Sequence, residues 1–159
     1  MSLPKHSAMP QKIILKNDRF ESHLTPLGNG YLISRNCFLT SHRHSSDDGL
    51  FFFVRDIDSG KMWSATQAPL FAPAHSYTFE SGLSSARFVR RDNESETILD
   101  IVLPPEEPCE LRRLTVRNLS DVERHIEITS SVDVILLFDP LRDARHQTFS
   151  NMFIGAEFS

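Results

Sequence analysis

The 159-residue sequence contains little cysteine, little glycine and a single tryptophan: two Cys, six Gly and one Trp. Cys37 and Cys109 lie far apart and neither belongs to a CxxC pair, which excludes a zinc site built on sulfur. The N-terminus lacks the hydrophobic segment of a signal peptide. We therefore expect two free thiols in a reducing compartment and a cytoplasmic location. No run of 18 apolar residues occurs, so no membrane span is expected in this chain.

An excess of basic residues is also missing. Lys and Arg number 17 against 21 Asp and Glu, which gives a net charge of −4 and argues against a nucleic-acid partner. Hydrophobic residues make up 40% and charged residues 24% of the chain, close to the averages of folded domains. We expect residues 1–10 to be a disordered tail or a vector-derived scar. Residues 11–159 then form one domain or part of one.

Alternation of apolar and polar residues is the main structural signal. Residues 125–138 alternate almost without error, which predicts one long, half-buried strand. Residues 94–103 and 110–118 show the same period, and a further strand is expected at residues 31–40. The chain has one short helix-compatible stretch, residues 140–146. Residues 149–158 read as the start of another strand.

Turn sequences separate these strands. Asp58-Ser59-Gly60 lies between residues 50–56 and 61–65 and predicts a hairpin. Asp92-Asn93 predicts a second hairpin between residues 86–91 and 94–103. Residues 65–76, with two prolines, are expected to be a surface loop. Short strands joined by hairpins predict an all-β fold, an antiparallel β-sandwich.

Polar candidates for a functional site gather at residues 42–48. Asp47 and Asp48 are paired carboxylates, but adjacent loop residues rarely aim at one substrate atom, so a solvated turn is the alternative. His42 and His44 are weak candidates for a metal site, against a polar loop tip. Arg43 suits a phosphate or a sugar hydroxyl, or is a surface charge. No cofactor is predicted.

Aromatic and arginine residues give two further hypotheses. Trp63, Phe71 or Tyr77 could offer a platform for sugar rings, although Trp63 closes a hairpin and is more often a packing residue. Five arginines resemble an anion site, but a solvated sheet face paired with glutamates is favoured. These arginines are Arg90, Arg91, Arg112, Arg113 and Arg117, and the glutamates are Glu94, Glu96 and Glu127.

Five segments, in order, resemble the N-terminal region of the inverting glycoside phosphorylases, formerly glycosyltransferase family 36. This family includes the cellobiose and chitobiose phosphorylases and the phosphorylase-like region of cyclic β-1,2-glucan synthases. The segments are GLFFFVRDIDSGKMWS at residues 49–64, SY at 76–77 with ARFVRR at 86–91, ELRRLTVRN at 110–118, EITS at 127–130 and HQTFSNMF at 146–153.

The resemblance implies a galactose-mutarotase-like super-sandwich, present here in part. In that family an (α/α)6 barrel holds the catalytic aspartate, so no catalytic residue is expected in this chain and it should not be active alone. The expected role is shaping of the carbohydrate rim and subunit assembly. Candidate carbohydrate contacts are Arg43, Asp47, Asp48, Trp63, Tyr77 and, from the last motif, His146.

Two alternatives stay open: a free-standing carbohydrate-binding module, and a small mutarotase-like enzyme with a histidine acid and a carboxylate base. The expected partners are a β-glucan or oligosaccharide, and either an (α/α)6 barrel domain or further copies of the chain. A partial sandwich exposes an edge strand and an apolar face. We therefore expect a homo-oligomer, with residues 125–138 or 149–158 near the contact.

Overall fold

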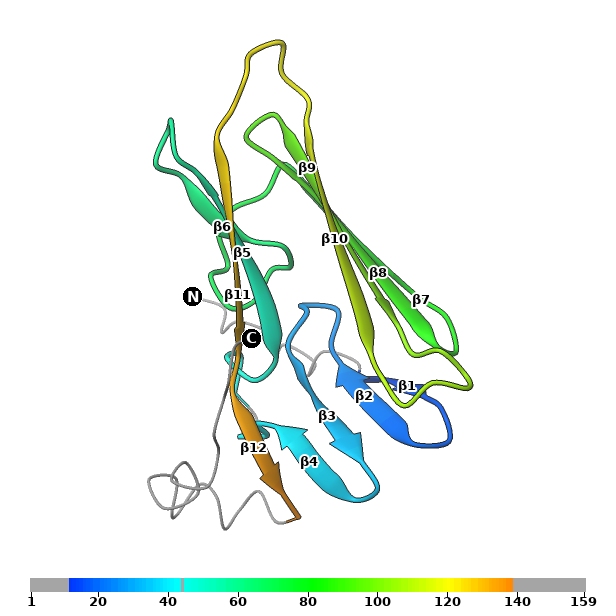
Figure 1. The fold of residues 1–159 in the computed structure, drawn as a ribbon. Coiled ribbons are helices and arrows are strands. Elements are labelled where there is room, and N and C mark those ends of the chain that lie inside the picture. Colours follow the sequence, from blue (N-terminus) through cyan, green and yellow to red (C-terminus); the bar gives the residue numbers. More distant parts are fainter. Residues whose placement is uncertain (1–11, 44, 139–159) are drawn as a thin grey trace, which may run out of the picture.

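A computed structural model describes residues 12–43 and 45–138 of the chain (Figure 1). These residues form twelve strands, all strand pairings among them are antiparallel, and no helix occurs among them. The described part therefore contains no helix of the length and apolarity needed to cross a membrane. The predicted all-β antiparallel fold is confirmed.

The strands form three sheets. The first has the order β1-β2-β3-β4-β12, the second β10-β9-β8-β7 and the third β11-β5-β6. The bounds are β1 Ile13–Lys16, β2 Phe20–Leu24, β3 Gly30–Ser34, β4 Cys37–Thr40, β5 Leu50–Asp56, β6 Met62–Ser64, β7 Ser76–Ser81, β8 Ser85–Asp92, β9 Ser95–Val102, β10 Leu111–Asn118, β11 Ile126–Val132 and β12 Val134–Leu137.

The core lies where the β7–β10 sheet faces the other two sheets (Figure 1). Trp63 on β6 is 2% exposed and donates its indole N–H to Thr97 Oγ1 on β9 at 3.2 Å, which joins two sheets. Burial of large apolar side chains supplies most of the driving force for such packing. The central cluster is Leu15, Leu24, Ala65, Ala86, Phe88, Leu99, Ile101 and Leu103.

Both predicted hairpins are present. In the β5–β6 hairpin, Asp56 Oδ1 accepts hydrogen bonds from the backbone N–H groups of Asp58 and Ser59, at 3.0 and 3.1 Å. These bonds, the one from Ser59 first, lower the pKa of Asp56. The β8–β9 hairpin turns at Asn93 and Glu94, both with positive φ (48° and 55°), as required by the tight turns that match strand twist.

Residues 125–138 do not form one strand, and that prediction is wrong. The run is divided at Asp133 into β11, which pairs with β5, and β12, which pairs with β4 in another sheet. The Asp133 carbonyl accepts a hydrogen bond from Ser41 N at 2.9 Å, and its carboxylate contacts Arg43 at 2.7 Å. Long-range contacts therefore move the strand from one sheet to the next.

The single strand predicted at residues 31–40 is also wrong. Arg35 and Asn36 have φ values of 48° and 65° and form a tight turn between β3 and β4. Strands β1 and β2 were not predicted. The expected tail at residues 1–10, the helix at 140–146 and the strand at 149–158 lie outside the described residues.

The 65–76 loop is only partly a surface loop. Its first residues, Ala65, Thr66 and Ala68, are buried, whereas Leu70 and Phe71 are 39% and 49% exposed. The Arg90 side chain, which is fully buried, donates to the carbonyls of Ala72 and Pro73 at 2.8 and 3.0 Å. Cysteines 37 and 109 are free thiols, as predicted.

Candidate functional site

A pocket of about 540 Å³ opens beside the β2–β3 connection. Its size falls within the range of sites that bind small molecules. The close pairing of β2 and β3 shapes one wall, because a Cβ at Gly30 would lie 1.8 Å from the His23 carbonyl oxygen. The lining residues are Lys12, His23, Leu24, Thr25, Asn29, Gly30, Tyr31, His42, Ser45 and Asp48.

A ladder of four rings runs across β2, β3, β4 and the residues that follow β4. His23 and Tyr31 are register partners, and their rings stack with centroids 4.5 Å apart and planes at 13°. The ring centroids of Tyr31 and His42 are 4.0 Å apart. The His42 ring in turn stacks on the ring of Phe38, with centroids 5.3 Å apart. Burial, and then the charge of Glu21, raises the pKa of Tyr31. We call His23, Tyr31, His42 and Phe38 the ring ladder.

The 41–49 loop borders the same pocket and is organised by Asp48. Although the sequence suggested a solvated turn, Asp48 is only 4% exposed. Its carboxylate accepts hydrogen bonds from the Ser41 hydroxyl at 3.1 Å and from the backbone N–H groups of Arg43 and Ser45 at 2.7 and 2.9 Å. Asp47 is exposed and does not line the pocket. Asp48 therefore organises the loop, whereas the Asp47 side chain is exposed to solvent.

Arg43 points to the junction between β11 and β12 and does not line the pocket. Its guanidinium contacts Asp133 at 2.7 Å, and both side chains are about 40% exposed, 38% and 42%. His42 belongs to the ring ladder, whereas His44 and His146 lie outside the described residues. Within residues 12–43 and 45–138, no three His, Cys, Asp or Glu side chains are grouped as a metal site requires.

The aromatic residues singled out in the sequence lie elsewhere. The interpretation of Trp63 as a packing residue is confirmed by its burial. The Tyr77 hydroxyl donates to the Pro26 carbonyl at 2.8 Å, its ring packs against the core, and burial raises its pKa. Neither side chain lines the pocket. The 65–76 loop thus presents an exposed phenyl ring, that of Phe71, and this ring lies outside the pocket.

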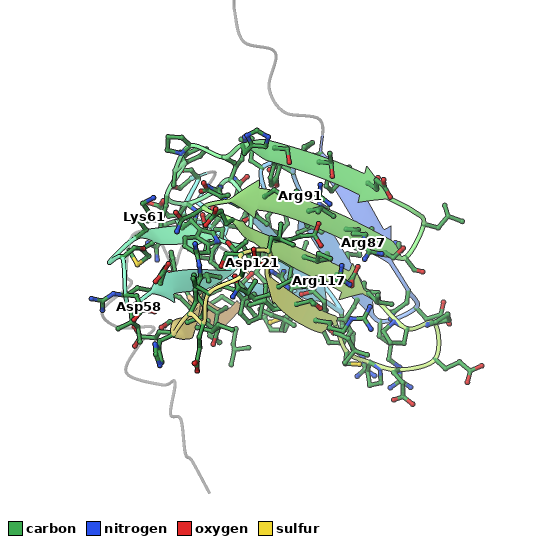
Figure 2. The ribbon with its side chains drawn as sticks, turned by 90° about the horizontal axis from the view of Figure 1, so that it is seen from above. Asp58, Lys61, Arg87, Arg91, Arg117 and Asp121 are labelled. Carbon is green, nitrogen blue, oxygen red and sulfur yellow. The ribbon has the colours of Figure 1, made fainter. Side chains whose placement is uncertain are left out.

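The interpretation of a solvated, paired arginine face is confirmed for Arg91, Arg113 and Arg117, which are exposed and contact Glu96 or Asp100. It is wrong for Arg90 and Arg112, whose side chains are buried. Figure 2 shows Arg87, Arg91 and Arg117 on this sheet, away from Asp58 and Lys61 at the β5–β6 turn. Hydrogen bonds from Arg91, and the charge of Arg117, lower the pKa of Glu96. The contacts are Arg91–Glu96 at 2.8 Å, Arg117–Glu96 at 3.0 Å, Arg87–Asp100 at 3.5 Å, Arg113–Asp100 at 2.9 Å and Arg112–Glu110 at 2.6 Å; Glu94 and Glu127 pair with Arg124 and Arg55.

Comparison with known families decides the assignment. The model of the glycosyl hydrolase 94 supersandwich domain matches residues 3–159. The chain belongs to this family. The resemblance found in the five sequence segments is therefore confirmed.

Two relatives match part of the sequence of this chain or most of it. The chain is 31% identical over 154 residues to the cyclic beta-(1,2)-glucan synthase NdvB of Rhizobium meliloti (strain 1021), covering 94% of this chain and 5% of the relative. It is 27% identical over 81 residues to a cellobionic acid phosphorylase of Neurospora crassa, covering 51% of this chain and 10% of that relative. The chain thus matches only a small fraction of the length of each relative.

Two of the family motifs serve the fold within the described residues. Residues 49–64 build the β5–β6 hairpin, and the Glu110–Arg112 pair of the third segment, residues 110–118, links two sheets. Arg112 donates to Glu110 at 2.6 Å and to the Leu50 carbonyl at the start of β5 at 2.5 Å. Both side chains are less than a tenth exposed. These two motifs therefore have structural roles in the fold.

Sequence reasoning missed several residues of the pocket, chiefly Lys12, His23 and Tyr31. A signal was present, because His23 and Tyr31 stand at matching distances from the turn between β2 and β3. Each lies on the face opposite the buried residues Ser22 and Leu24. Recognising the β2–β3 hairpin would have paired the two rings. The pairing with His42, from a different loop, required the structure.

Proposed function

We propose that this chain is a non-catalytic supersandwich module of a larger protein of the glycoside phosphorylase or cyclic β-glucan synthase type. There it shapes the carbohydrate-binding rim and takes part in subunit assembly. The observation that carries this proposal is the match of 94% of the chain to 5% of a glucan synthase, which leaves most of the relative to other parts. The catalytic step belongs, in this proposal, to a separate (α/α)6 barrel.

The carboxylates support a non-catalytic role. An acid that protonates a glycosidic oxygen needs a carboxyl group with a raised pKa. Among the described residues, every carboxyl with a shifted pKa has it lowered by hydrogen bonds: Glu21, Asp56, Asp58 and Glu96. Asp48 is engaged by three donors. The four carboxyls with a lowered pKa are held as anions and are poorly suited to give up a proton.

Phosphorolysis tests this part of the proposal. The purified 159-residue chain, incubated with inorganic phosphate and a β-glucan or cellobiose, should release no glucose 1-phosphate. A full-length relative with its barrel serves as the positive control. Turnover by the isolated chain, retained after repeated purification, would overturn the non-catalytic assignment.

The assembly role is supported by strand β11. It pairs with β5 along one edge, and within the described residues its other edge has no strand. Ile128 and Val132 are 52% and 43% exposed on the same face. Open edges with exposed apolar residues promote pairing with another chain. We commit to a second copy, because antiparallel pairing of two β11 strands about Ser130 would set Ile128 against Val132.

The oligomeric state tests the assembly role. Light scattering coupled to size exclusion should report a dimer for the wild-type chain and a monomer for Ile128→Lys. The control is Ile57→Lys, which adds the same charge at a side chain of similar exposure (55%) on the β5–β6 turn and should remain dimeric. A monomeric wild-type chain at high concentration would contradict this interface.

A further inference from the structure

We propose that the pocket beside the β2–β3 connection binds a neutral sugar ring, with the ring ladder as its recognition surface. This inference rests on the proposed function only in placing the domain beside a carbohydrate. It assigns the contact to Tyr31 and its neighbours, and away from the 65–76 loop that the sequence suggested.

The ring ladder offers the two surfaces that a sugar needs. A pyranose has a C–H face that packs on aromatic carbon, and hydroxyl groups around its rim that require hydrogen-bond partners. Imidazole and phenol rings combine apolar area with polar atoms. Tyr31 lines the pocket together with His23 and His42, so its phenol ring borders the space that a ligand would fill.

The walls of the pocket are fixed before any ligand enters. The Thr25 hydroxyl donates to Asn29 Oδ1, and Asn29 Nδ2 donates to the Ser45 carbonyl at 3.2 Å. The Gly30 N–H donates to the Asp48 carbonyl at 2.8 Å, which ties β3 to the 41–49 loop. A preformed site loses less entropy on binding than one that must order itself.

The charges favour a neutral ligand over an anion. Lys12 Nζ lies 5.9 Å from the centre of the Tyr31 ring, and it is the one lysine in the lining. Asp48, which also lines the pocket, carries a negative charge. A second carboxylate is close by, because Glu21 Oε2 lies 3.1 Å from Nε2 of His23. An anion would meet as much negative as positive charge. A sugar without a charged group avoids this conflict.

The test is a titration of the full 159-residue chain with cellobiose and sophorose, followed by amide chemical shifts. We expect saturable shifts at His23, Tyr31 and His42. Tyr31→Ala should weaken binding about tenfold, in line with the contribution of one well-packed aromatic ring, and Tyr31→Phe by a smaller factor. The matched control is Phe71→Ala, which removes an exposed ring from the 65–76 loop and should bind as wild type does.

Three results would overturn the inference. They are the absence of shifts at millimolar sugar, equal affinity of wild type and Tyr31→Ala, and a loss of binding in Phe71→Ala in place of Tyr31→Ala. Tighter binding of glucose 1-phosphate than of cellobiose would overturn its neutral character. Unchanged amide spectra away from the pocket show that each variant is folded. The dimer measurement tests β11 and the phosphorolysis measurement tests turnover. Neither depends on the pocket, so their outcomes are independent of this titration.

Discussion

Two buried charged side chains, Arg90 and Asp48, each organise a loop, and they do so in opposite ways. Arg90 donates to the backbone carbonyls of Ala72 and Pro73 and to the Asp92 carboxylate. Asp48 accepts from backbone N–H groups and a hydroxyl. The Arg90 loop packs onto the core through Ala65 and Ala68, whereas the Asp48 loop borders an open pocket.

The difference shows how one kind of interaction serves two ends. A buried charge must be matched by hydrogen bonds wherever it lies. Where the ordered loop covers the core, the result is stability alone. Where the ordered loop borders the pocket, the hydrogen bonds that satisfy the buried charge also hold the pocket wall in place. We therefore expect substitutions at Arg90 to affect folding, and those at Asp48 to affect both folding and ligand binding.

The largest effect is expected for Arg90→Met. The change removes a fully buried guanidinium and leaves the Asp92 carboxylate, which is 27% exposed, and the loop carbonyls without their donor. Unfolding in urea should show a loss of about 3–5 kcal/mol, the range for breaking a buried charged pair. Arg87→Met, on the same strand but 48% exposed, is the control and should change stability by less than about 0.5 kcal/mol. Equal losses in both variants would remove the distinction drawn for Arg90.

A smaller effect is expected for Asp48→Asn. The amide keeps the size of the side chain but brings a donor group toward the donors of Arg43 and Ser45. The stability should fall by about 1–3 kcal/mol, the cost of an unsatisfied buried group. The sugar titration should weaken in parallel. Asp47→Asn, at the exposed neighbour, should leave both measurements at the wild-type value. Intact sugar binding in a destabilised Asp48→Asn chain would separate the loop from the pocket.

The paired arginine face predicts a dependence of stability on pH. The pKa of Glu96 is lowered from its ordinary value of 4.5, first by the hydrogen bond from Arg91. Its contribution to stability is thus present above pH 4.5 and is lost as the pH falls from 4.5 through the lower folded value. Urea midpoints measured from pH 7 to pH 3 should fall less steeply for Glu96→Gln than for wild type. Glu80→Gln, which removes an exposed carboxylate from β7, should keep the wild-type slope.

The smallest effect is expected for Arg113→Ala. Its contact with Asp100 measures 2.9 Å, yet the Arg113 side chain is 76% exposed. Water screens such a pair, so the free energy of unfolding should change by less than about 0.5 kcal/mol. A loss as large as that of Arg90→Met would mean that the exposed arginines share the role of the buried one.

The sequence predicted those parts of the fold whose signals are local. The hairpins at Asp58–Gly60 and Asn93 carry their own turn residues, and residues 94–103 and 110–118 carry a clear two-residue period. The break at Asp133 left no local trace, because the contacts that redirect the strand come from Ser41 and Arg43. The Arg35-Asn36 turn was missed because only Asn has a preference for positive φ there.

The candidate site was harder to predict than the fold. Asp48 was recognised as a site residue, but its burial depends on three donors supplied by its own loop. Tyr31 was placed in a strand and given no role, since its importance comes from His23 on β2 and His42 beyond β4. A single sequence does not show which rings meet across strands. Trp63 was considered as a sugar contact because it is the single tryptophan of the sequence, but it is a buried packing residue.

The passage of the chain from β11 into β12 has a consequence for synthesis on the ribosome. One continuous segment, drawn in yellow to orange in Figure 1, supplies an edge strand to two sheets whose partners β5 and β4 are translated much earlier. Such distant pairings are slow to form. A nascent chain that has not yet reached Ile126 therefore carries β4 and β5 with an unprotected edge. We expect that interval to be when the domain is most open to chaperones or to aggregation.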